Sequence, residues 1–365
     1  MNVSSTLSPD ILQTAPLPPE GPIAHASVWT GPSLAGRDDW IVPLSPEDTA
    51  EIRRAVEAAA QRGRPLASLS TDSFPLPGLA GRLDDIRRTL IAGRGFVLLR
   101  GLDIAGWSKW QAACAFLGIG AHLGTPRSQN AQGHLLGHVC DLGDDAQSDP
   151  NTRGYRGAGR MNFHTDSVDI VGLFCWRAAM QGGESRLVSV AALYNRFREL
   201  RPDLLPALFA PIHRDRRGEV PAGKPPWWVM PVLQWHNGRL HCHFSGLYIR
   251  STQRFEAVPR LSRAQQEMLD LVETIAEDPS IHHVMDFRQG DMQFLSNHDV
   301  LHGRADYRDW PEPDRKRYLF RLWLCPPDGR PLPDSFSDRY GSVTIGDRGG
   351  IICPTTTLSA PLEPA

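Results

Sequence analysis

Two short stretches of the chain carry residues that could bind a metal ion together. His164 and Asp166 lie within residues 162–166, and His302 lies far downstream within residues 297–303. Two imidazoles and one carboxylate form the ligand set that holds a non-haem Fe(II) ion on one face and leaves the other face open. Alternate residues of a strand point to the same side, so His164 and Asp166 could reach one ion. The residue types alone also fit ordinary hydrogen-bonded polar side chains of strands.

The same His-x-Asp spacing recurs at His213 and Asp215, but its context favours the first copy. His164 follows a glycine-rich loop and precedes the apolar run 169–176, whereas His213 lies in a connection rich in Pro and Arg. The sequence His-Arg-Asp also occurs in kinases, but no glycine-rich phosphate loop or Asp-Phe-Gly accompanies it in this chain. Two further histidine pairs are expected to be structural: His134 with His138, and His241 with His243.

A basic segment downstream of His302 runs into an apolar strand. Arg317 and Arg321 are four residues apart in it and share a strand parity, so both can face one cavity. A guanidinium binds a carboxylate through two parallel hydrogen bonds and could therefore hold a dicarboxylate co-substrate. The alternative for both arginines is a solvated or salt-bridged face.

Taken in order, these features resemble a known family. The chain is similar to the taurine dioxygenase/TfdA-like family of Fe(II)- and 2-oxoglutarate-dependent dioxygenases from about Gly95 to Pro331. The segments that carry the resemblance are residues 96–101, 163–166, 182–185, 293–298 with 301–302, and 317–321. The ordered set is far more specific than any one of its members.

The resemblance implies a site and a reaction. His164, Asp166 and His302 would be the metal ligands, Arg317 the residue that binds 2-oxoglutarate, and Ser185 its hydroxyl partner. Because the interval from Asp166 to Ser185 is shorter than in taurine dioxygenase, Ser189 is the alternative hydroxyl. Fe(II), 2-oxoglutarate and O2 are then required, and decarboxylation of 2-oxoglutarate to succinate is coupled to oxidation of a second substrate.

The resemblance also narrows the second substrate and the outcome. Arg321 corresponds to the arginine that contacts the anionic substrate in the taurine enzyme. We therefore expect a small anionic or zwitterionic substrate, such as an organic acid or an amino-acid-like compound. Halogenating relatives replace the carboxylate ligand with a small residue. The presence of Asp166 therefore favours hydroxylation, desaturation or another oxygenase outcome, with hydroxylation first.

Two other classes of function fit the same residues. One is a zinc-dependent hydrolase or lyase, since zinc accepts His and Asp ligands. The other is a non-catalytic binding protein on a jelly-roll scaffold, because a fold does not prove an activity. Oxygen consumption that depends on 2-oxoglutarate would separate the oxygenase from the first, and stoichiometric Fe(II) binding would separate it from the second.

Composition excludes several partners. The 39 basic and 41 acidic residues give a formal net charge of −2, which gives no general attraction to nucleic acid or to an anionic membrane. The six cysteines form no Cys-x-x-Cys, and several lie in apolar runs, so we expect buried reduced thiols. We find no signal peptide or membrane-spanning run and expect a cytoplasmic protein, and a homo-oligomer is compatible with the sequence.

The element pattern predicts an α+β chain. Helices are expected at about 45–61, 83–91, 108–117, 191–199 and 262–277, and strands at 96–99, 134–139, 169–176, 185–190, 229–235, 239–248, 284–287, 292–295 and 318–324. Asn237-Gly238 is the strongest hairpin signal. The resemblance implies a double-stranded β-helix, or jelly roll, with flanking helices. We expect a Pro/Ser/Gly-rich arm at 1–39, one catalytic domain at 40–331 and a Pro/Gly-rich tail at 332–365. The loops at 125–160 and 211–228 should border the site, the second as a candidate lid.

Overall fold

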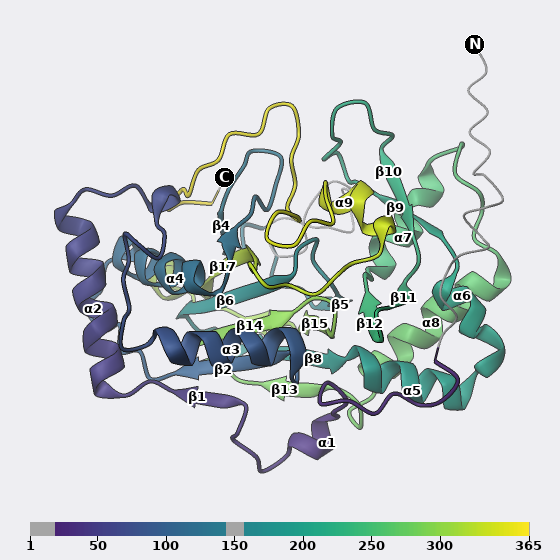
Figure 1. Ribbon diagram of the computed structural model, residues 1–365, viewed down its shortest axis with the longest axis horizontal. Helices are drawn as coiled ribbons and strands as arrows, with labels where there is room; N and C mark the ends of the chain where they lie inside the picture. Colours follow the sequence, from purple (N-terminus) through teal and green to yellow (C-terminus); the bar gives the residue numbers. More distant parts are fainter. Residues whose placement is uncertain (1–18, 144–156, 365) are drawn as a thin grey trace.

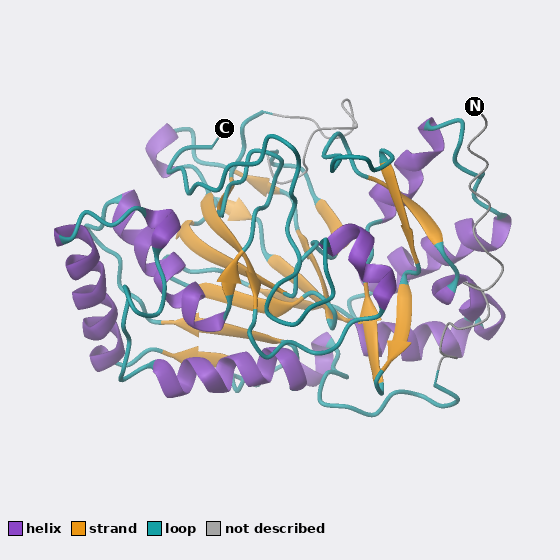
Figure 2. Cartoon of the chain, turned by 45° about the horizontal axis from the view of Figure 1, so that its top comes forward, coloured by secondary structure: helices purple, strands orange, loops and turns teal. Residues whose placement is uncertain are grey.

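The computed structural model describes residues 19–143 and 157–364 and contains two main β-sheets with helices around them (Figures 1 and 2). The larger sheet has seven strands in the order β1 (Ile41–Pro43), β2 (Phe96–Arg100), β14 (Met292–Ser296), β6 (Ile170–Arg177), β17 (Tyr318–Cys325) and β3 (Thr125–Pro126), with β4 (Leu136–Val139) also paired to β17. The smaller sheet has the order β13 (His283–Met285), β8 (Ser185–Ser189), β15 (Val300–Arg304) and β5 (Met161–His164). Apart from the parallel pair β1 and β2, these strands pair antiparallel, so the chain is an α+β protein with a mixed sheet.

The two sheets share a hydrophobic core. Phe96, Leu295 and Trp323 from the larger sheet pack in one buried cluster with Leu187 and Val300 from the smaller sheet. Removing these apolar side chains from water is the main free energy that holds the sheets face to face. The site described below lies where the two sheets meet.

Two N-terminal helices, α3 (Ala80–Ala92) and α4 (Lys109–Leu123), cover the other face of the larger sheet, and Figure 1 shows α3 running along the sheet. A third, α2 (Pro46–Gln61), packs against α4. Ser45 and Ser108 cap α2 and α4 as their sequences predict, each with a reciprocal capping box. The stacked rings of Phe116 on α4 and Phe174 on β6 join helix to sheet, with centroids 5.5 Å apart.

Helix α4 extends six residues beyond its predicted end at Leu117. Gly118 and Gly120, which favour a helix end in sequence, are buried in its middle. A Cβ atom at Gly118 would lie 2.3 Å from the Phe74 ring, and one at Gly120 would lie 2.7 Å from Leu322. These glycines therefore permit close packing between elements and do not terminate the helix.

A second group of helices packs at the opposite end of the molecule, seen on the right in Figure 1. It comprises α5 (Val190–Leu200), α6 (Leu205–Phe209) and α8 (Arg263–Glu277), together with the hairpin of β11 (Leu233–His236) and β12 (Arg239–Cys242). Asn237 and Gly238 form the predicted turn, both at positive φ. Both strands beside it are shorter than expected. Residues 229 and 230 of the first belong to β10 (Trp227–Met230), and the backbone after the second, which ends at Cys242, turns into α7 (Gly246–Ser251).

The predicted loop at 211–228 contains a second hairpin. Strand β9 (Ile212–Asp215) pairs antiparallel with β10 (Trp227–Met230). Arg214 is fully buried and its guanidinium donates to the backbone carbonyls of Ile212, Met230, Pro231 and His243. The many arginines of this stretch thus fix a β-structure whose prolines and glycines obscure it in sequence.

Both terminal regions pack onto the body where they are described. Near the N-terminus, α1 (Gly31–Leu34) follows Trp29, whose ring lies 4.9 Å from that of Phe96. The C-terminal residues, yellow in Figure 1, include α9 (Ser337–Tyr340) and pack on the loop that follows β5, where Gly350 donates to the Ser167 carbonyl. The remaining short elements are β7 (Gln181–Gly182), β16 (Tyr307–Arg308) and single 3-10 turns at 66–68, 202–204, 252–254, 313–315 and 334–336.

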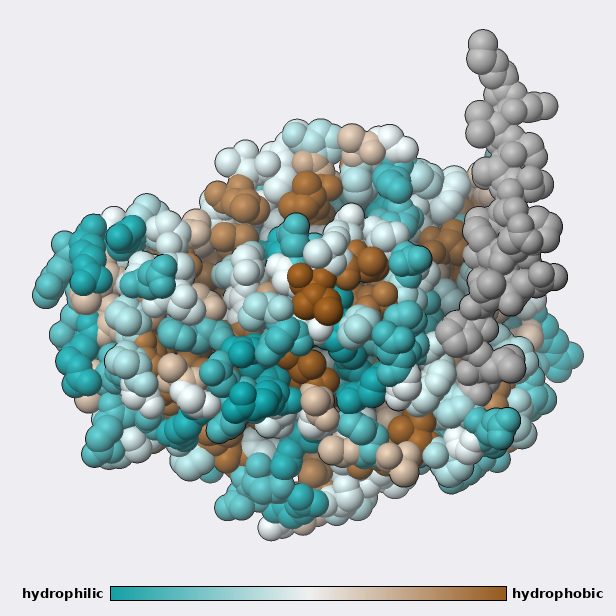
Figure 3. Space-filling view, in the orientation of Figure 1, coloured by the Kyte–Doolittle hydropathy of each residue, from teal (hydrophilic) through white to brown (hydrophobic). Residues whose placement is uncertain are grey.

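Surface character is mixed. In Figure 3 the visible face is largely hydrophilic, and its hydrophobic residues form small separate groups. Among the described residues, no helix combines the length and apolar character needed to cross a membrane.

Candidate metal centre

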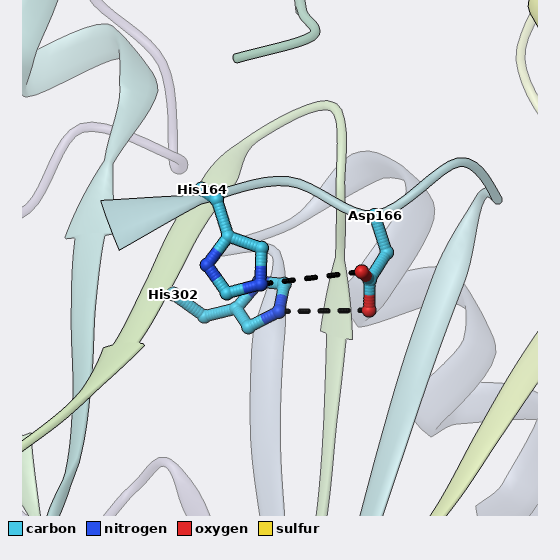
Figure 4. A group of neighbouring side chains, drawn as sticks. All are labelled: His164, Asp166 and His302. Atoms are coloured by element: carbon cyan, nitrogen blue, oxygen red, sulfur yellow. Dashed lines mark ion pairs between the residues drawn. The ribbon is translucent and has the colours of Figure 1, made fainter. Parts of the chain in front are cut away.

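His164 and His302 are directly opposite each other on two paired strands. His164 ends β5, His302 is the third residue of β15, and the two are partners in the antiparallel register. Their ring centroids are 4.3 Å apart. The Nδ1–H of His164 donates to the Asn162 carbonyl at 2.8 Å, which turns its Nε2 toward the third member of the group, as Figure 4 shows.

Asp166 completes the group from the turn after β5. The prediction that His164 and Asp166 alternate along one strand is wrong, because the strand ends at His164. Asp166 Oδ1 nevertheless lies 4.0 Å from His164 Nε2, and Oδ2 lies 3.7 Å from His302 Nε2. Among the described residues, these three form the only group of His, Cys or acidic side chains whose candidate ligand atoms lie within 4.8 Å of one another.

Three further residues hold Asp166. The indole Nε1–H of Trp323 donates to Oδ2 at 2.9 Å, and Arg321 Nη1 donates to the same oxygen at 3.4 Å. The side-chain oxygen of Asn297 accepts from the Asp166 backbone N–H at 3.0 Å. Sequence reasoning missed the role of Trp323. Trp323 is two residues from Arg321 on one strand, so their side chains point to the same face, and this spacing could have indicated its role.

The charges of the group suit a metal. Burial, followed by the positive charge of His302, lowers the pKa of His164 to about 4. Burial alone would raise the pKa of Asp166, but the positive charge of Arg321 and the nearby imidazole of His302 outweigh it, so this pKa is lowered. Near neutral pH, His164 is therefore a neutral imidazole and Asp166 a carboxylate, which are the forms that coordinate a cation.

A cavity adjoins the group and is lined by basic and apolar side chains. Ser185, Arg304, Arg317 and Arg321 line it together with His164 and His302, and the apolar lining is Val139, Met161, Val171, Leu173, Phe287 and Leu319. Arg317 is 4% exposed, and its Nη1 has no hydrogen-bond partner among the described residues. Burial lowers the pKa of this arginine.

Arg304 was not predicted as a site residue. Sequence reasoning concentrated on residues 314–323, although His302-Gly303-Arg304 places this arginine on the same strand face as a predicted ligand. Burial, followed by the positive charge of Arg317, lowers its pKa to about 10.

The two candidate serines lie in different surroundings. Ser185 lines the cavity, and its hydroxyl is 3.1 Å from the side-chain amide of Gln293. Ser189 is fully buried, accepts from the Ala192 N–H as the N-cap of α5 and donates to the Ser27 carbonyl. Only Ser185 can therefore reach a molecule in the cavity.

The other histidines lie apart from the group. His213 is beside Asp215, whose carboxylate pairs with Arg254 at 2.9 Å. His138 is hydrogen-bonded to the Tyr318 hydroxyl at 2.8 Å. His241 and His243 are buried on and just after β12, consistent with the expectation that they are structural.

The donor set fits an Fe(II) ion, since two imidazole nitrogens and one carboxylate oxygen can occupy one face of an octahedron. The buried Nη1 of Arg317, which has no hydrogen-bond partner in the part of the chain that the structure describes, fits an anion in the adjoining cavity.

The fold is similar to that of asparagine oxygenase. A crystal structure of asparagine oxygenase in complex with Fe(II), 2S,3S-3-hydroxyasparagine and succinate superposes with a TM-score of 0.59, at 17% identity, covering 78% of this chain and 93% of that one. The chain belongs to the TauD, TfdA family, described as taurine catabolism dioxygenases, whose sequence model matches residues 62–323. It is accordingly an Fe(II)- and 2-oxoglutarate-dependent dioxygenase, an oxidoreductase.

Two curated relatives extend over most of the chain. FR-33289 synthase from Streptomyces rubellomurinus (strain ATCC 31215) is 30% identical over 327 residues, which are 88% of this chain and 95% of the relative. Taurine hydroxylase-like protein SAT17 from Stachybotrys chartarum (strain CBS 109288 / IBT 7711) is 31% identical over 324 residues, 84% of this chain and 83% of the relative. The resemblance inferred from the short segments is thus confirmed at the level of the family.

Proposed function

We propose that His164, Asp166 and His302 are the Fe(II) ligands of this dioxygenase. The observation that carries the proposal is the convergence of their three ligand atoms within 4.8 Å at the edge of a basic cavity. Asp166 is oriented for this role by Trp323 and Arg321, since hydrogen bonds to a ligating carboxylate fix its direction.

Two residues that line the cavity support a binding place for the co-substrate. We propose that Arg317 binds the distal carboxylate of 2-oxoglutarate with Ser185 beside it, while the 2-oxo acid end faces the metal ligands. The iron, when bound, supplies the O2 chemistry that couples decarboxylation of 2-oxoglutarate to oxidation of the second substrate. The apolar side chains Val171, Leu173 and Leu319 limit water in the cavity, which strengthens the attraction between guanidinium and carboxylate.

For the second substrate we propose a small anionic or zwitterionic molecule that is hydroxylated. Arg321 supports this charge preference, because its guanidinium lines the cavity beside Asp166. The relative from Stachybotrys chartarum is named as taurine hydroxylase-like, and taurine is a zwitterion. The asparagine oxygenase crystal contains a hydroxylated amino acid.

We further propose that the two main sheets are the halves of a double-stranded β-helix. Their shared core and the pairing of β15 with both β5 and β8 support that arrangement. We propose that residues 40–331 form a single catalytic domain, against which the C-terminal residues pack through the buried pair of Arg348 and Asp169.

The test is oxygen consumption by the Fe(II)-loaded protein with 2-oxoglutarate and a panel of small amino acids, sulfonates and organic acids. We expect O2 uptake and succinate formation in equal amounts with at least one compound, and loss of both in Asp166→Ala. Activity with Zn(II) but not Fe(II), and no need for 2-oxoglutarate, would instead support the hydrolase alternative.

A further inference from the structure

Arg304 is a second buried guanidinium in the cavity, and the family resemblance gave it no role. It is 4% exposed and lines the cavity together with Arg317. Its Nη2 donates to the carbonyls of Gly157 and Gly159, whereas its Nε and Nη1 have no hydrogen-bond partner among the described residues. Donors buried in this way without a partner are costly unless a ligand satisfies them.

The strand register places Arg304 next to the proposed co-substrate residues. Arg304 and Ser185 are direct partners between β15 and β8, so their side chains leave the sheet on the same face. The Arg317 and Arg304 guanidiniums lie 5.0 Å and 4.8 Å from the centroid of the Tyr307 ring. One hydroxyl and two guanidiniums therefore surround the same end of the cavity.

The distance from the metal ligands suits a five-carbon dicarboxylate. Arg304 is two residues beyond His302, and two strand residues span about 6.6 Å. A chain of five carbons with C–C bonds of about 1.5 Å has a comparable length. A molecule with its 2-oxo acid end at His302 would thus carry its other carboxylate to the row of Arg304 and Ser185.

Charge favours an anion at this place. Arg321 pairs with Asp166 at 3.4 Å, whereas Asp141 and Asp309, whose negative charges act on Arg304 and Arg317, form no salt bridge with them among the described residues. Two like charges that share a buried cavity repel each other unless an anion lies between them. We propose that Arg304 and Arg317 together bind the distal carboxylate of 2-oxoglutarate. This inference rests on the proposed function.

The test compares two ligands that differ only in the distal carboxylate. The dissociation constants of 2-oxoglutarate and 2-oxovalerate are measured by anaerobic calorimetry on the Fe(II)-loaded protein and on its Arg304→Met variant. We expect the variant to lose about 10- to 100-fold in affinity for 2-oxoglutarate, the loss typical of a charge-assisted hydrogen bond, and none for 2-oxovalerate.

Two variants serve as controls. Arg304→Lys keeps a cation and should lose less affinity for 2-oxoglutarate than Arg304→Met. Arg186→Met removes a buried arginine on the neighbouring strand that pairs with Glu277 outside the cavity, and should leave both affinities unchanged.

Other outcomes overturn the inference. Equal weakening of both ligands by Arg304→Met would mean that the arginine only supports the backbone at Gly157 and Gly159. Unchanged binding of 2-oxoglutarate would mean that Arg317 suffices. A wild-type protein that binds Fe(II) but not 2-oxoglutarate would overturn the proposed function as well, so the two failures are distinguishable.

Discussion

The indole of Trp323 donates a 2.9 Å hydrogen bond to the carboxylate of Asp166. This contact joins β17 of the larger sheet to the turn after β5 in the smaller sheet. The orientation of the proposed carboxylate ligand therefore depends on how the two sheets pack, and not only on its own segment.

Replacement of Trp323 by Phe should weaken Fe(II) binding. The ring is retained in part, but Oδ2 of Asp166 loses its shortest hydrogen bond, and such losses typically reduce metal affinity about 10- to 100-fold. The measurement is anaerobic competition with a chelator. Trp29→Phe is the matched control, since its indole donates an equivalent 2.9 Å bond to the Arg94 carbonyl in the same core cluster. Equal Fe(II) affinity in both variants would contradict the role of Trp323.

Replacement of Gly183 by Ala should weaken 2-oxoglutarate binding without affecting Fe(II) binding. A Cβ atom there would lie 3.0 Å from Nε of Arg317, and the residue has a φ of +78°. Gly238→Ala is the control, because φ is +71° but no atom lies within 4 Å of its added Cβ. Calorimetry should show a larger dissociation constant for 2-oxoglutarate in the first variant only. A similar loss of 2-oxoglutarate affinity in Gly238→Ala would mean that backbone strain, and not contact with Arg317, weakens the binding.

Replacement of Asp169 by Asn should destabilise the protein. Asp169 is buried, accepts from Arg348 at 2.6 Å and pairs with His298 at 3.0 Å. Removal of one partner from a buried ion pair typically costs about 3–5 kcal/mol, because the other charge remains buried. Urea unfolding at pH 7 measures this free energy. A loss below about 1 kcal/mol would not exceed the effect of a typical point substitution and would contradict the prediction.

The loss of stability in Asp169→Asn should depend on pH. Burial alone would raise the pKa of Asp169, but the hydrogen bonds with His298 and Arg348 lower it to about 2. In the unfolded chain, the pKa of an Asp carboxyl is near 4. Because the pKa is lower in the folded chain, the ionised carboxylate stabilises the fold fully at any pH above the pKa of the unfolded chain. This stabilisation disappears as the pH falls through the pKa of the folded protein. The gap in unfolding free energy between wild type and Asp169→Asn should therefore narrow from pH 4 to pH 2, and a constant gap would refute the assignment.

Thiol reactivity should be confined to Cys353. Burial raises the pKa of Cys114, Cys175 and Cys242 to about 12, so few of these thiols are ionised at neutral pH. Cys140 and Cys325 are also buried, whereas Cys353 is partly exposed. A thiol reagent should modify one cysteine quickly in the native protein, and this rapid reaction should be absent in Cys353→Ser. A second thiol of equal rate in the variant would contradict this.

Much of the architecture was accessible from sequence because local signals agree with it. Ser45 and Ser262 begin helices as their capping patterns predict, and Asn237-Gly238 forms the expected turn. The residue types of His164, Asp166 and His302, together with the family resemblance, led us to expect them at one site, and the fold does bring them together.

What sequence could not give depends on contacts between distant segments. Asp166 leaves the strand that its spacing suggested, and Trp323 finds it only through the packing of two sheets. The C-terminal residues look like a Pro/Gly-rich tail, yet Arg348 reaches the buried Asp169. Part of the predicted loop at 125–160, residues 144–156, lies outside the described residues. The cytoplasmic location, the oligomeric state and the candidate lid at 211–228 stay predictions.

The most direct test of the central claim is an anaerobic titration of the metal-free protein, first with Fe(II) and then with 2-oxoglutarate. We predict one Fe(II) per chain and a visible charge-transfer band when 2-oxoglutarate is added. His164→Ala should lose the band, and Arg317→Ala should need far more 2-oxoglutarate to produce it. Fe(II) binding without a band in the wild type, or a full band in His164→Ala, would contradict the assignment of these residues to the iron and its co-substrate.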